Sequence, residues 1–484
     1  MRHYRTWAHV LGTLLLVTAG AMVLPLLVSV YYGEDDLEAF IVTITVTTAV
    51  GLPLWAGFRR EQKLRASGAF LIAAFGWVVI GGVSAVPFVL HGSVPSFIDA
   101  FFEMISGYTT TGATILPDIE ALPHGLLLWR SETHFLGGMG FITLAVLFLP
   151  HGIIGLRLFR AESSPGQIIT KERFTARNRD AMWALWGIYV ALNALQVLLL
   201  LPKMSLFDAL CHAWGTVSTS GFSTYNSSMG HFESAWVDWV TIVFMFLGGV
   251  SFMLFISALR GDWRRIQRDT ELWWYAAILA VLCGGVALVL WGHGTYGLLD
   301  SVRFGTFQVM SILTTTGFTT ADYELWPNGA QMLLYIACFV GACAGSTTSG
   351  IKVVHYVILG KFMVGAVRKI FFQPLAVISV RLNKERIETS AVHLAICYFV
   401  VNIFLVLGGG VVMSLLDDMD VMSAMSSVIA SLMNIGPGFG EVGPSQNWSG
   451  ISDAGKVFLT WNMLVGRLEM FTALVLFYPS FWRS

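Results

Sequence analysis

A short motif of hydroxyl residues followed by glycine recurs along the chain, and it restricts the possible folds more than any other feature. Three copies read TTTGAT, STSGFS and TTTGFT, and a looser fourth copy reads NIGPGFG. Their first glycines are Gly112, Gly221, Gly317 and Gly436, with separations of 109, 96 and 119 residues (221−112, 317−221, 436−317). Recurrence at this scale indicates repeated structural units. The sequence therefore predicts four similar units that place four such loops around one axis.

The composition places these units in a membrane. Of the 484 residues, 55% are hydrophobic and only 12% are charged. A soluble protein of this size could not bury so much apolar surface, and several stretches reach the length of about 20 residues that a helical crossing needs. The net charge of −1 offers no basic field for nucleic acid, and the five cysteines are too scattered for a disulfide framework or a zinc site.

We expect an all-α polytopic protein with ten spans. Residues 1–67 form a hairpin of two spans (7–31 and 37–58), and four units follow at 68–180, 181–270, 271–387 and 388–484. Each unit has a first span, a short segment, the glycine loop and a second span. The first spans are expected at 68–90, 181–201, 271–291 and 388–415, the short segments at 95–108, 206–217, 299–313 and 420–433, and the second spans at 129–154, at 236–259, from 331 onward and at 455–477.

The distribution of basic residues predicts the orientation. Lys and Arg gather before residue 6, at 59–65, at 157–179, at 260–268 and at 361–386. Because such residues accumulate on the cytoplasmic side, both termini are expected inside, and the glycine loops are expected to open toward the outside.

The short segments explain why the loops resemble an ion filter. Each holds about 12 to 15 residues, which is too few to cross a bilayer. Irregular backbone at membrane depth is tolerated only inside protein or beside a water-filled cavity. A desolvated cation needs replacement oxygens, which rings of backbone carbonyls can supply, and glycine permits the strained backbone that points them inward. The alternative interpretation is that these loops are re-entrant turns that only pack helices together.

Four such units with these loop sequences resemble the superfamily of potassium transporters that includes the bacterial TrkH/TrkG and KtrB subunits and the plant HKT proteins. The N-terminal hairpin and the NIGPGFG loop are similar to the TrkH/TrkG branch, and the resemblance covers essentially the entire chain. It implies potassium selectivity with one glycine per filter loop. It also implies that the two residues before each glycine line the ion path: Thr110 and Thr111, Thr219 and Ser220, Thr315 and Thr316, and Asn434 and Ile435.

The four loops are not equivalent in this chain. Ile435 can offer a cation only its backbone carbonyl, so the fourth loop departs from the Thr/Ser pattern. Some relatives that favour sodium carry serine in the first loop, and Gly112 argues against that preference here.

Two further elements are candidates for a gate. Arg467 lies in the last span, roughly 18 Å from its outer start, and an intramembrane arginine is a functional candidate; the alternative is a structural pair with Glu469 or a carbonyl. Residues 341–350 contain Gly341, Gly345 and Gly350, which should break the second helix of unit three. A close helix crossing is the simpler interpretation. The resemblance implies instead that this loop blocks the pore, and that Arg467 faces the pore beneath the filter.

The sequence thus predicts a transporter for potassium uptake across the bacterial inner membrane, and no enzyme. The resemblance implies a homodimer and a TrkA-like cytosolic ring subunit that binds nucleotides and controls the gate; this chain itself is expected to bind lipid and transported potassium, and no cofactor. A proton- or sodium-coupled symporter of the same fold remains the nearer alternative. A membrane enzyme or sensor is the other class, and a cluster of convergent acid, base or metal ligands would favour it.

Overall fold

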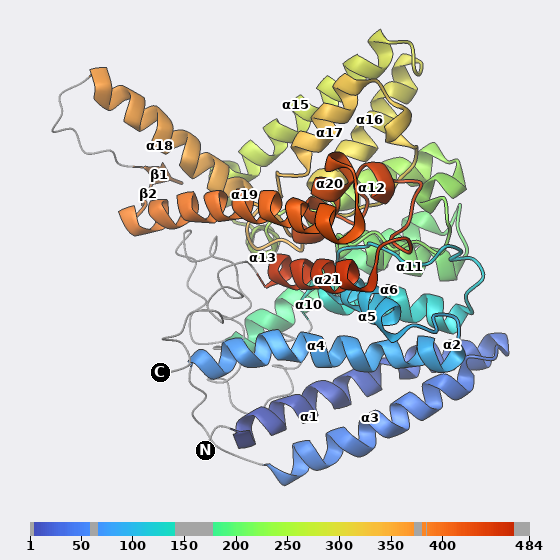
Figure 1. The fold of residues 1–484 in the computed structure, drawn as a ribbon. Helices are drawn as coiled ribbons and strands as arrows, with labels where there is room; N and C mark the ends of the chain where they lie inside the picture. Colours follow the sequence, from blue (N-terminus) through green and yellow to red (C-terminus); the bar gives the residue numbers. More distant parts are fainter. Residues whose placement is uncertain (1–3, 59–65, 141–177, 372–379, 384, 469–484) are drawn as a thin grey trace.

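The computed structural model describes residues 4–58, 66–140, 178–371, 380–383 and 385–468, which are mostly helical (Figure 1). The N-terminal pair consists of α1 (Tyr4–Ala21), its continuation α2 (Val23–Tyr32), and α3 (Leu37–Gly57). α1 packs along α3, and Gly12 lies directly against the backbone of Gly51 and Trp55. These helices cover one side of α4 (Ala66–His91), as Figure 1 shows at the blue end of the chain.

The helices that follow repeat the predicted order of long helix, short helix, loop and second helix. The first set comprises α4, α5 (Phe97–Tyr108) and α6 (His124–Gly138), and the second comprises α10 (Asn178–Leu200), α11 (Leu206–Val217), α12 (Ala235–Gly248) and α13 (Phe252–Leu259). The third set comprises α15 (Thr270–Gly292), α16 (Leu298–Leu313), α17 (Asn328–Ala337) and α18 (Val353–Phe371). The fourth set comprises α19 (Thr389–Asp417), α20 (Val421–Leu432) and α21 (Asp453–Arg467). In each set the long first helix packs against the short one.

The remaining elements are small. A short helix, α14 (Trp263–Arg268), connects the second and third sets, and 3-10 turns occur at Ser228–Phe232, Tyr323–Leu325 and Gly440–Val442. A two-stranded antiparallel hairpin, β1 (Arg381–Leu382) with β2 (Glu385–Arg386), precedes α19, and Arg381 pairs with Arg386. α18 and α19 pack together and extend beyond the other helices (Figure 1).

Five helical stretches within the described residues are long and apolar enough to cross a membrane. They are Arg5–Tyr32, Leu37–Gly57, Trp183–Leu200, Thr270–Gly292 and Thr389–Asp417. α12 and α13 would form a sixth span, bent by 93° between the two helices. The second spans expected at 129–154 and 455–477 are described only up to residues 140 and 468, so their remainders lie outside the described residues.

The prediction of one continuous helix over 236–259 is wrong. The chain breaks at 249–251 because residues of the 341–350 segment occupy that place: the Cys343 amide donates to the Gly249 carbonyl (3.0 Å), and the Phe252 amide donates to the Gly345 carbonyl (2.9 Å). A continuous helix would use these two helix groups internally. The break is therefore caused by a segment about 90 residues away, which local sequence signals cannot reveal.

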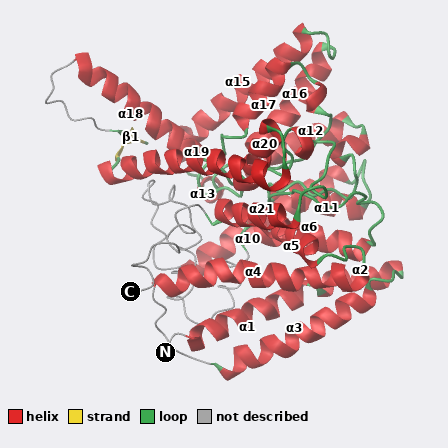
Figure 2. Cartoon of the chain, viewed as in Figure 1, coloured by secondary structure: helices red, strands yellow, loops and turns green. Residues whose placement is uncertain are grey.

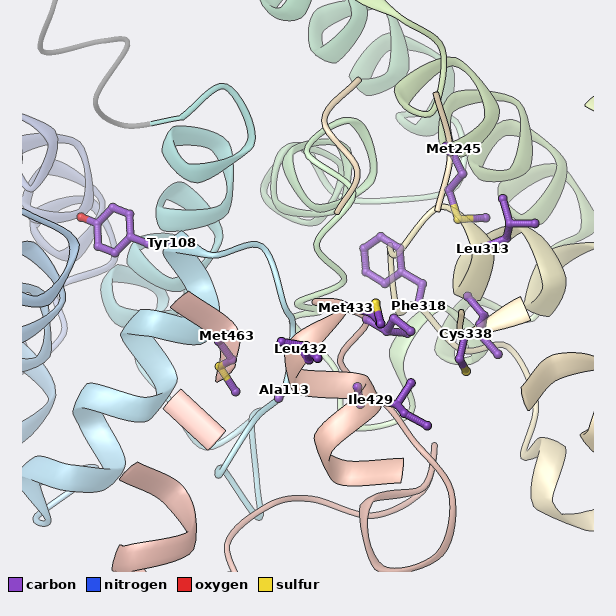
Figure 3. Packing of buried hydrophobic residues seen from close by; sticks show 14 of the residues in the cluster. Tyr108, Ala113, Met245, Leu313, Phe318, Cys338, Ile429, Leu432, Met433 and Met463 are labelled. Atoms are coloured by element: carbon purple, nitrogen blue, oxygen red, sulfur yellow. The ribbon is translucent and has the colours of Figure 1, made fainter. Parts of the chain in front are cut away.

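A continuous apolar core lies among the repeated sets and surrounds the loops. Figure 3 shows part of it, with Tyr108 and Ala113 from the first set, Leu313 and Phe318 from the third, and Met433 from the fourth. Loop segments run among the helices in the middle of the molecule near α20 and α21 (Figure 2). Because that interior backbone is irregular, its polar groups need partners other than those of a helix.

Candidate functional site

Four short helices, α5, α11, α16 and α20, lead directly into the four glycine loops. α5 and α11 begin with the same cap: the Ser96 hydroxyl accepts a hydrogen bond from the Asp99 amide (3.3 Å), and the Ser205 hydroxyl accepts one from the Asp208 amide (3.0 Å). The Asp420 carboxylate caps α20 in a similar way. Since the C-terminal end of a helix carries partial negative charge, each helix favours a cation near its loop.

Each short helix ends in the same hydrogen-bonded turn, a Schellman motif. After α5, the Thr111 amide donates to the Ser106 carbonyl (2.9 Å) and the Thr110 amide donates to the Gly107 carbonyl (3.0 Å). The same two bonds follow the other helices: Ser220 to Gly215 with Thr219 to Thr216, Thr316 to Ser311 with Thr315 to Ile312, and Ile435 to Ala430 with Asn434 to Ser431. This motif requires a left-handed residue, which lies two positions before each loop glycine.

That left-handed position is never glycine in this chain. The φ angles are 56° at Thr110, 56° at Thr219, 55° at Thr315 and 55° at Asn434. A β-branched residue in this region is a conformational outlier that costs about 1–3 kcal/mol, and such residues cluster at functional sites. From the motif, unusual backbone was expected at the glycines alone. The three threonine positions carry no local signal, because no propensity rule marks threonine as left-handed, whereas asparagine tolerates this region and made Asn434 recognisable.

The four loop glycines also have positive φ, and they bring the loops into contact with one another. The angles are 80° at Gly112, 81° at Gly221, 82° at Gly317 and 96° at Gly436. A Cβ added at each glycine would lie under 3.0 Å from a carbonyl oxygen of another loop: Ser220 for Gly112, Thr316 for Gly221, Ile435 for Gly317 and Thr111 for Gly436. The contacts run from loop one to two, three, four and back to one. The four loops therefore form a closed ring.

The side chains just before the glycines point back to the helix ends. The Thr111 hydroxyl bonds to that of Thr109 (2.8 Å), and the Thr316 hydroxyl bonds to that of Thr314 (2.8 Å). Ser220 and Ser218 form the equivalent pair (2.5 Å). These hydroxyls therefore stabilise the turns, and the backbone carbonyls of the same residues remain at the ring.

The fourth loop lacks this hydroxyl pair and uses a different contact. Asn434 donates from Nδ2 to the Thr111 hydroxyl (2.8 Å) and to the Met463 carbonyl (3.0 Å). Its side chain thus connects loop four to loop one and to α21. The asymmetry predicted from Ile435 is accompanied by a specific bond across the ring.

The segment 341–350 lies against loops two and three. It belongs to the irregular stretch between α17 and α18, in which Gly345 and Gly350 have φ of 73° and 77°. The Thr347 hydroxyl donates to the carbonyls of Val217 (3.0 Å) and Gly248 (3.1 Å), and the Ser349 amide donates to the Thr315 hydroxyl (3.1 Å). The predicted break in the second helix of unit three is therefore present, and it places the segment directly beside two of the left-handed threonines.

Glu271, at the start of α15, connects this segment to the start of α18. Its Oε1 accepts hydrogen bonds from the amides of Ala344 (2.8 Å) and Val354 (3.1 Å). Glu271 is buried, at 6% exposure. Because Ala344 lies within the segment and Val354 in α18, a single buried carboxylate joins the two.

Arg467 is half-buried at the end of α21 and contacts two other parts of the molecule. Its Nη1 donates to the Thr347 carbonyl (3.0 Å), and its Nη2 donates to the carbonyls of Gly138 (3.0 Å) and Gly137. The carbonyl contacts of the structural alternative are thus present, whereas Glu469 lies outside the described residues. Arg467 places a positive charge against the 341–350 segment and joins it to the end of α6.

One buried ion pair near the loops is not part of any sequence motif described above. Arg130 of α6 donates from Nε to Glu103 Oε1 of α5 (2.8 Å), and the two side chains are 1% and 0% exposed. Glu103 also accepts from the Ile115 amide (2.9 Å), just beyond the first loop glycine. In the sequence, the only local sign of this pair is Glu103 itself, a charged residue nine positions before the glycine (112−103). Its partner Arg130 could not be inferred from spacing alone.

Comparison with protein families identifies relatives over nearly the whole chain. Residues 36–280 and 293–484 match the TrkH family, described as cation transport proteins. The Trk system potassium uptake protein TrkH of Salmonella typhimurium is 37% identical over 495 residues, covering 100% of both chains. The Trk system potassium uptake protein TrkG of Escherichia coli is 33% identical over 493 residues, covering 100% of this chain and 99% of the relative.

A solved structure has the same fold. The crystal structure of the potassium transporter TrkH from Vibrio parahaemolyticus matches with a TM-score of 0.89 and 32% sequence identity, over 99% of this chain and 100% of the other. This likeness confirms the predicted all-α polytopic architecture.

Proposed function

This chain belongs to the TrkH family of cation transport proteins, and from this premise we propose that it carries potassium into the cell through the ring of four loops. The relatives named above are potassium uptake proteins, and the family is one of transporters and not of enzymes. The proposed filter consists of Thr110, Thr111 and Gly112 and their equivalents in the other three loops. Potassium is the transported ion, and no cofactor is assigned to this chain.

The observation that carries the proposal is the closed ring of carbonyls. Each loop glycine lies against a backbone carbonyl of the next loop, and that carbonyl belongs to the residue just before the next loop's own glycine. Four carbonyls and four glycines therefore alternate around one centre. Such carbonyls can replace the water molecules around a potassium ion. The Schellman turns and the hydroxyl pairs hold these groups in place before an ion arrives, which lowers the cost of binding.

The gate is proposed to be the 341–350 segment together with Arg467. Two contacts support this assignment: Thr347 bonds to the end of α11, and Arg467 bonds to Thr347. Lys352 adds a second cation: it is buried, and its Nζ donates to the Thr348 hydroxyl (3.0 Å). A positive charge beside an ion path repels cations. If the 341–350 segment moved, it would cease to obstruct the path and would also change its contact with Arg467.

The assembly is proposed from the family and from charge. We expect a homodimer in the bacterial inner membrane with both termini in the cytoplasm, four pore units with the boundaries given above, and a cytosolic ring subunit that binds nucleotides and controls the gate. A proton- or sodium-coupled symporter remains the alternative mechanism, because both mechanisms need the filter.

Flux into proteoliposomes tests the proposal. Potassium, rubidium, sodium and lithium uptake would be compared with and without a proton gradient. Substitution Gly221→Ala places a Cβ against the Thr316 carbonyl and should lower potassium uptake at least tenfold. The matched control Gly284→Ala adds a Cβ where nothing lies within 4 Å, and it should leave uptake unchanged. Equal uptake in the two variants, or no potassium uptake by the unaltered protein, would contradict the proposal; a required proton gradient would favour the symporter.

A further inference from the structure

The carbonyl two residues after each loop glycine is held by the preceding unit. The residues concerned are Thr114, Ser223, Thr319 and Gly438 (114−112, 223−221, 319−317, 438−436). Their carbonyls accept hydrogen bonds from the Trp448 amide (2.8 Å), from Arg130 Nη1 (3.1 Å), from the Gly230 amide (3.1 Å) and from the Tyr323 hydroxyl (2.6 Å), respectively. We call these four bonds the outer belt.

The outer belt follows the same order around the ring at every junction. Unit four donates to loop one, unit one to loop two, unit two to loop three and unit three to loop four. Two donors are backbone amides and two are side chains, and all four differ in their distance along the chain from their own loop glycine, so the repeat itself does not generate them. The shared feature is the acceptor. Each of these carbonyls is turned toward a neighbouring unit, which fixes the peptide that follows the filter.

We propose that the outer belt sets the width of the filter, and that Tyr323 and Arg130 are its positioning residues. This inference rests on the proposed function of the loops as a potassium filter. Neither residue needs to touch an ion. A loop whose outer end is fixed to its neighbour cannot close around a smaller cation without breaking a buried hydrogen bond, and this restraint favours potassium over sodium.

Arg130 is unsuitable as the first test. It holds the Ser223 carbonyl, the Thr114 hydroxyl (3.3 Å) and the buried Glu103, and its guanidinium lies 3.9 Å from the centre of the Phe222 ring. Removing one partner of a buried ion pair strongly destabilises a protein, so loss of function in such a variant would not separate positioning from folding.

Tyr323 allows a conservative test because a matched control lies beside it. The rings of Tyr323 and Tyr335 both contact Phe439, with centroids 5.1 and 5.7 Å away. Tyr323 is buried and its hydroxyl donates to the Gly438 carbonyl (2.6 Å), whereas within the described residues Tyr335 has ring contacts and no hydrogen bond. Substitutions Tyr323→Phe and Tyr335→Phe therefore remove the same atom from the same aromatic cluster, and only the first breaks the outer belt.

The experiment measures potassium and sodium uptake by the full-length protein in liposomes, with KM and maximal rate for each ion and the melting temperature of each variant. Tyr323→Phe should lower the ratio of potassium to sodium uptake by about two- to tenfold, the range that one hydrogen bond of this kind supplies. Its maximal potassium rate and melting temperature should stay close to those of Tyr335→Phe, whose selectivity should equal that of the unaltered protein.

Two results would overturn the inference while leaving the proposed function standing. In one, Tyr323→Phe keeps the full selectivity of the unaltered protein. In the other, both variants lose selectivity equally, which would assign the effect to packing around Phe439. If the unaltered protein takes up no potassium, the proposed function fails, and this inference fails with it.

Discussion

At the residue scale, the loops depend on a conformation that the sequence motif does not reveal. Thr219 and Thr315 adopt left-handed backbone angles that glycine would adopt at less cost. Their hydroxyls give a reason for retaining threonine: that of Thr315 accepts the Ser349 amide (3.1 Å), and that of Thr219 lies 3.4 Å from the Thr347 hydroxyl. The strained residues therefore connect the ring to the 341–350 segment.

The loop glycines could be predicted from the sequence, but the contacts of Arg467 could not. The position of Gly317 follows from its motif, because a turn that crowds another backbone needs a residue without Cβ. The contacts of Arg467 do not follow, because they join groups 120 and 329 residues apart in the chain. Its distance from the start of the last helix follows from helical rise, whereas its partners required the folded structure.

Replacing Arg467 separates its charge from its hydrogen bonds. Arg467→Gln removes a positive charge beside the proposed ion path and should raise basal potassium flux by roughly tenfold or more, given the size of charge interactions at such distances. Arg467→Lys keeps the charge but loses the two-pronged contact with Thr347 and Gly138, so it should raise flux much less. Liposome flux measurements without any regulatory subunit would show this.

The control for Arg467 is Arg260→Gln, which removes a charge from an exposed arginine at the end of α13. It should not change the flux. If the lysine and glutamine variants of Arg467 leak equally, Arg467 acts through its hydrogen bonds alone and the electrostatic barrier is ruled out.

At the scale of elements, one irregular segment determines the shape of a helix far away in the chain. The helix break at residues 341–350 was predicted from its glycines. The division of the second span of unit two into α12 and α13 was not predicted. The carbonyls of Gly248 and Gly249 accept bonds from Thr347 and Cys343 and no longer serve a continuous helix. Secondary structure here is a consequence of tertiary contact, which a local pattern cannot contain.

Thr347→Val tests how firmly this segment is held. Valine keeps the branched shape but removes the hydroxyl that donates to the carbonyls of Val217 and Gly248. The loss should cost about 1–2 kcal/mol, which would raise the open fraction and the basal potassium flux by roughly 5- to 30-fold. Flux assays in liposomes would measure the change.

The control Thr241→Val also removes a buried threonine hydroxyl, but that hydroxyl has no hydrogen-bond partner within the described part of the chain. It should leave flux unchanged. A silent Thr347→Val variant would show that the segment is not a gate held by this contact.

At the scale of the whole molecule, the structure is a ring of unequal units. The fourfold repetition of the motif was sufficient to predict four units around one axis, because the lengths of the hydrophobic stretches set the order of long and short helices in each unit. The junctions were not predictable: they use Trp448, Arg130, Gly230 and Tyr323, which share neither type nor spacing. Sequence repetition thus specified the units, whereas the contacts between units arose from residues outside the motif.

The junction between units three and four offers a test by pH. Glu324, in the loop after the third glycine, accepts a hydrogen bond from the Gly440 amide. Burial raises the pKa of the Glu324 carboxyl above its ordinary value of 4.5, although the Gly440 hydrogen bond acts in the opposite direction. The carboxyl is then easier to ionise in the unfolded chain than in the folded one. Its contribution to folding stability is therefore most favourable at low pH and declines as the pH rises through 4.5 toward the folded-state pKa.

Glu324→Gln removes this titration while keeping an oxygen that can accept the Gly440 amide. Between about pH 4 and pH 7, the unaltered protein should lose melting temperature relative to the variant, so the two curves should diverge as pH rises and stay apart above the folded-state pKa. The control Glu441→Gln changes an exposed carboxyl in the adjoining turn and should run parallel to the unaltered protein. If the melting curve of Glu324→Gln also runs parallel to that of the unaltered protein, ionisation of Glu324 does not lower folding stability at this junction. Units three and four would then be joined through Tyr323 without an electrostatic cost.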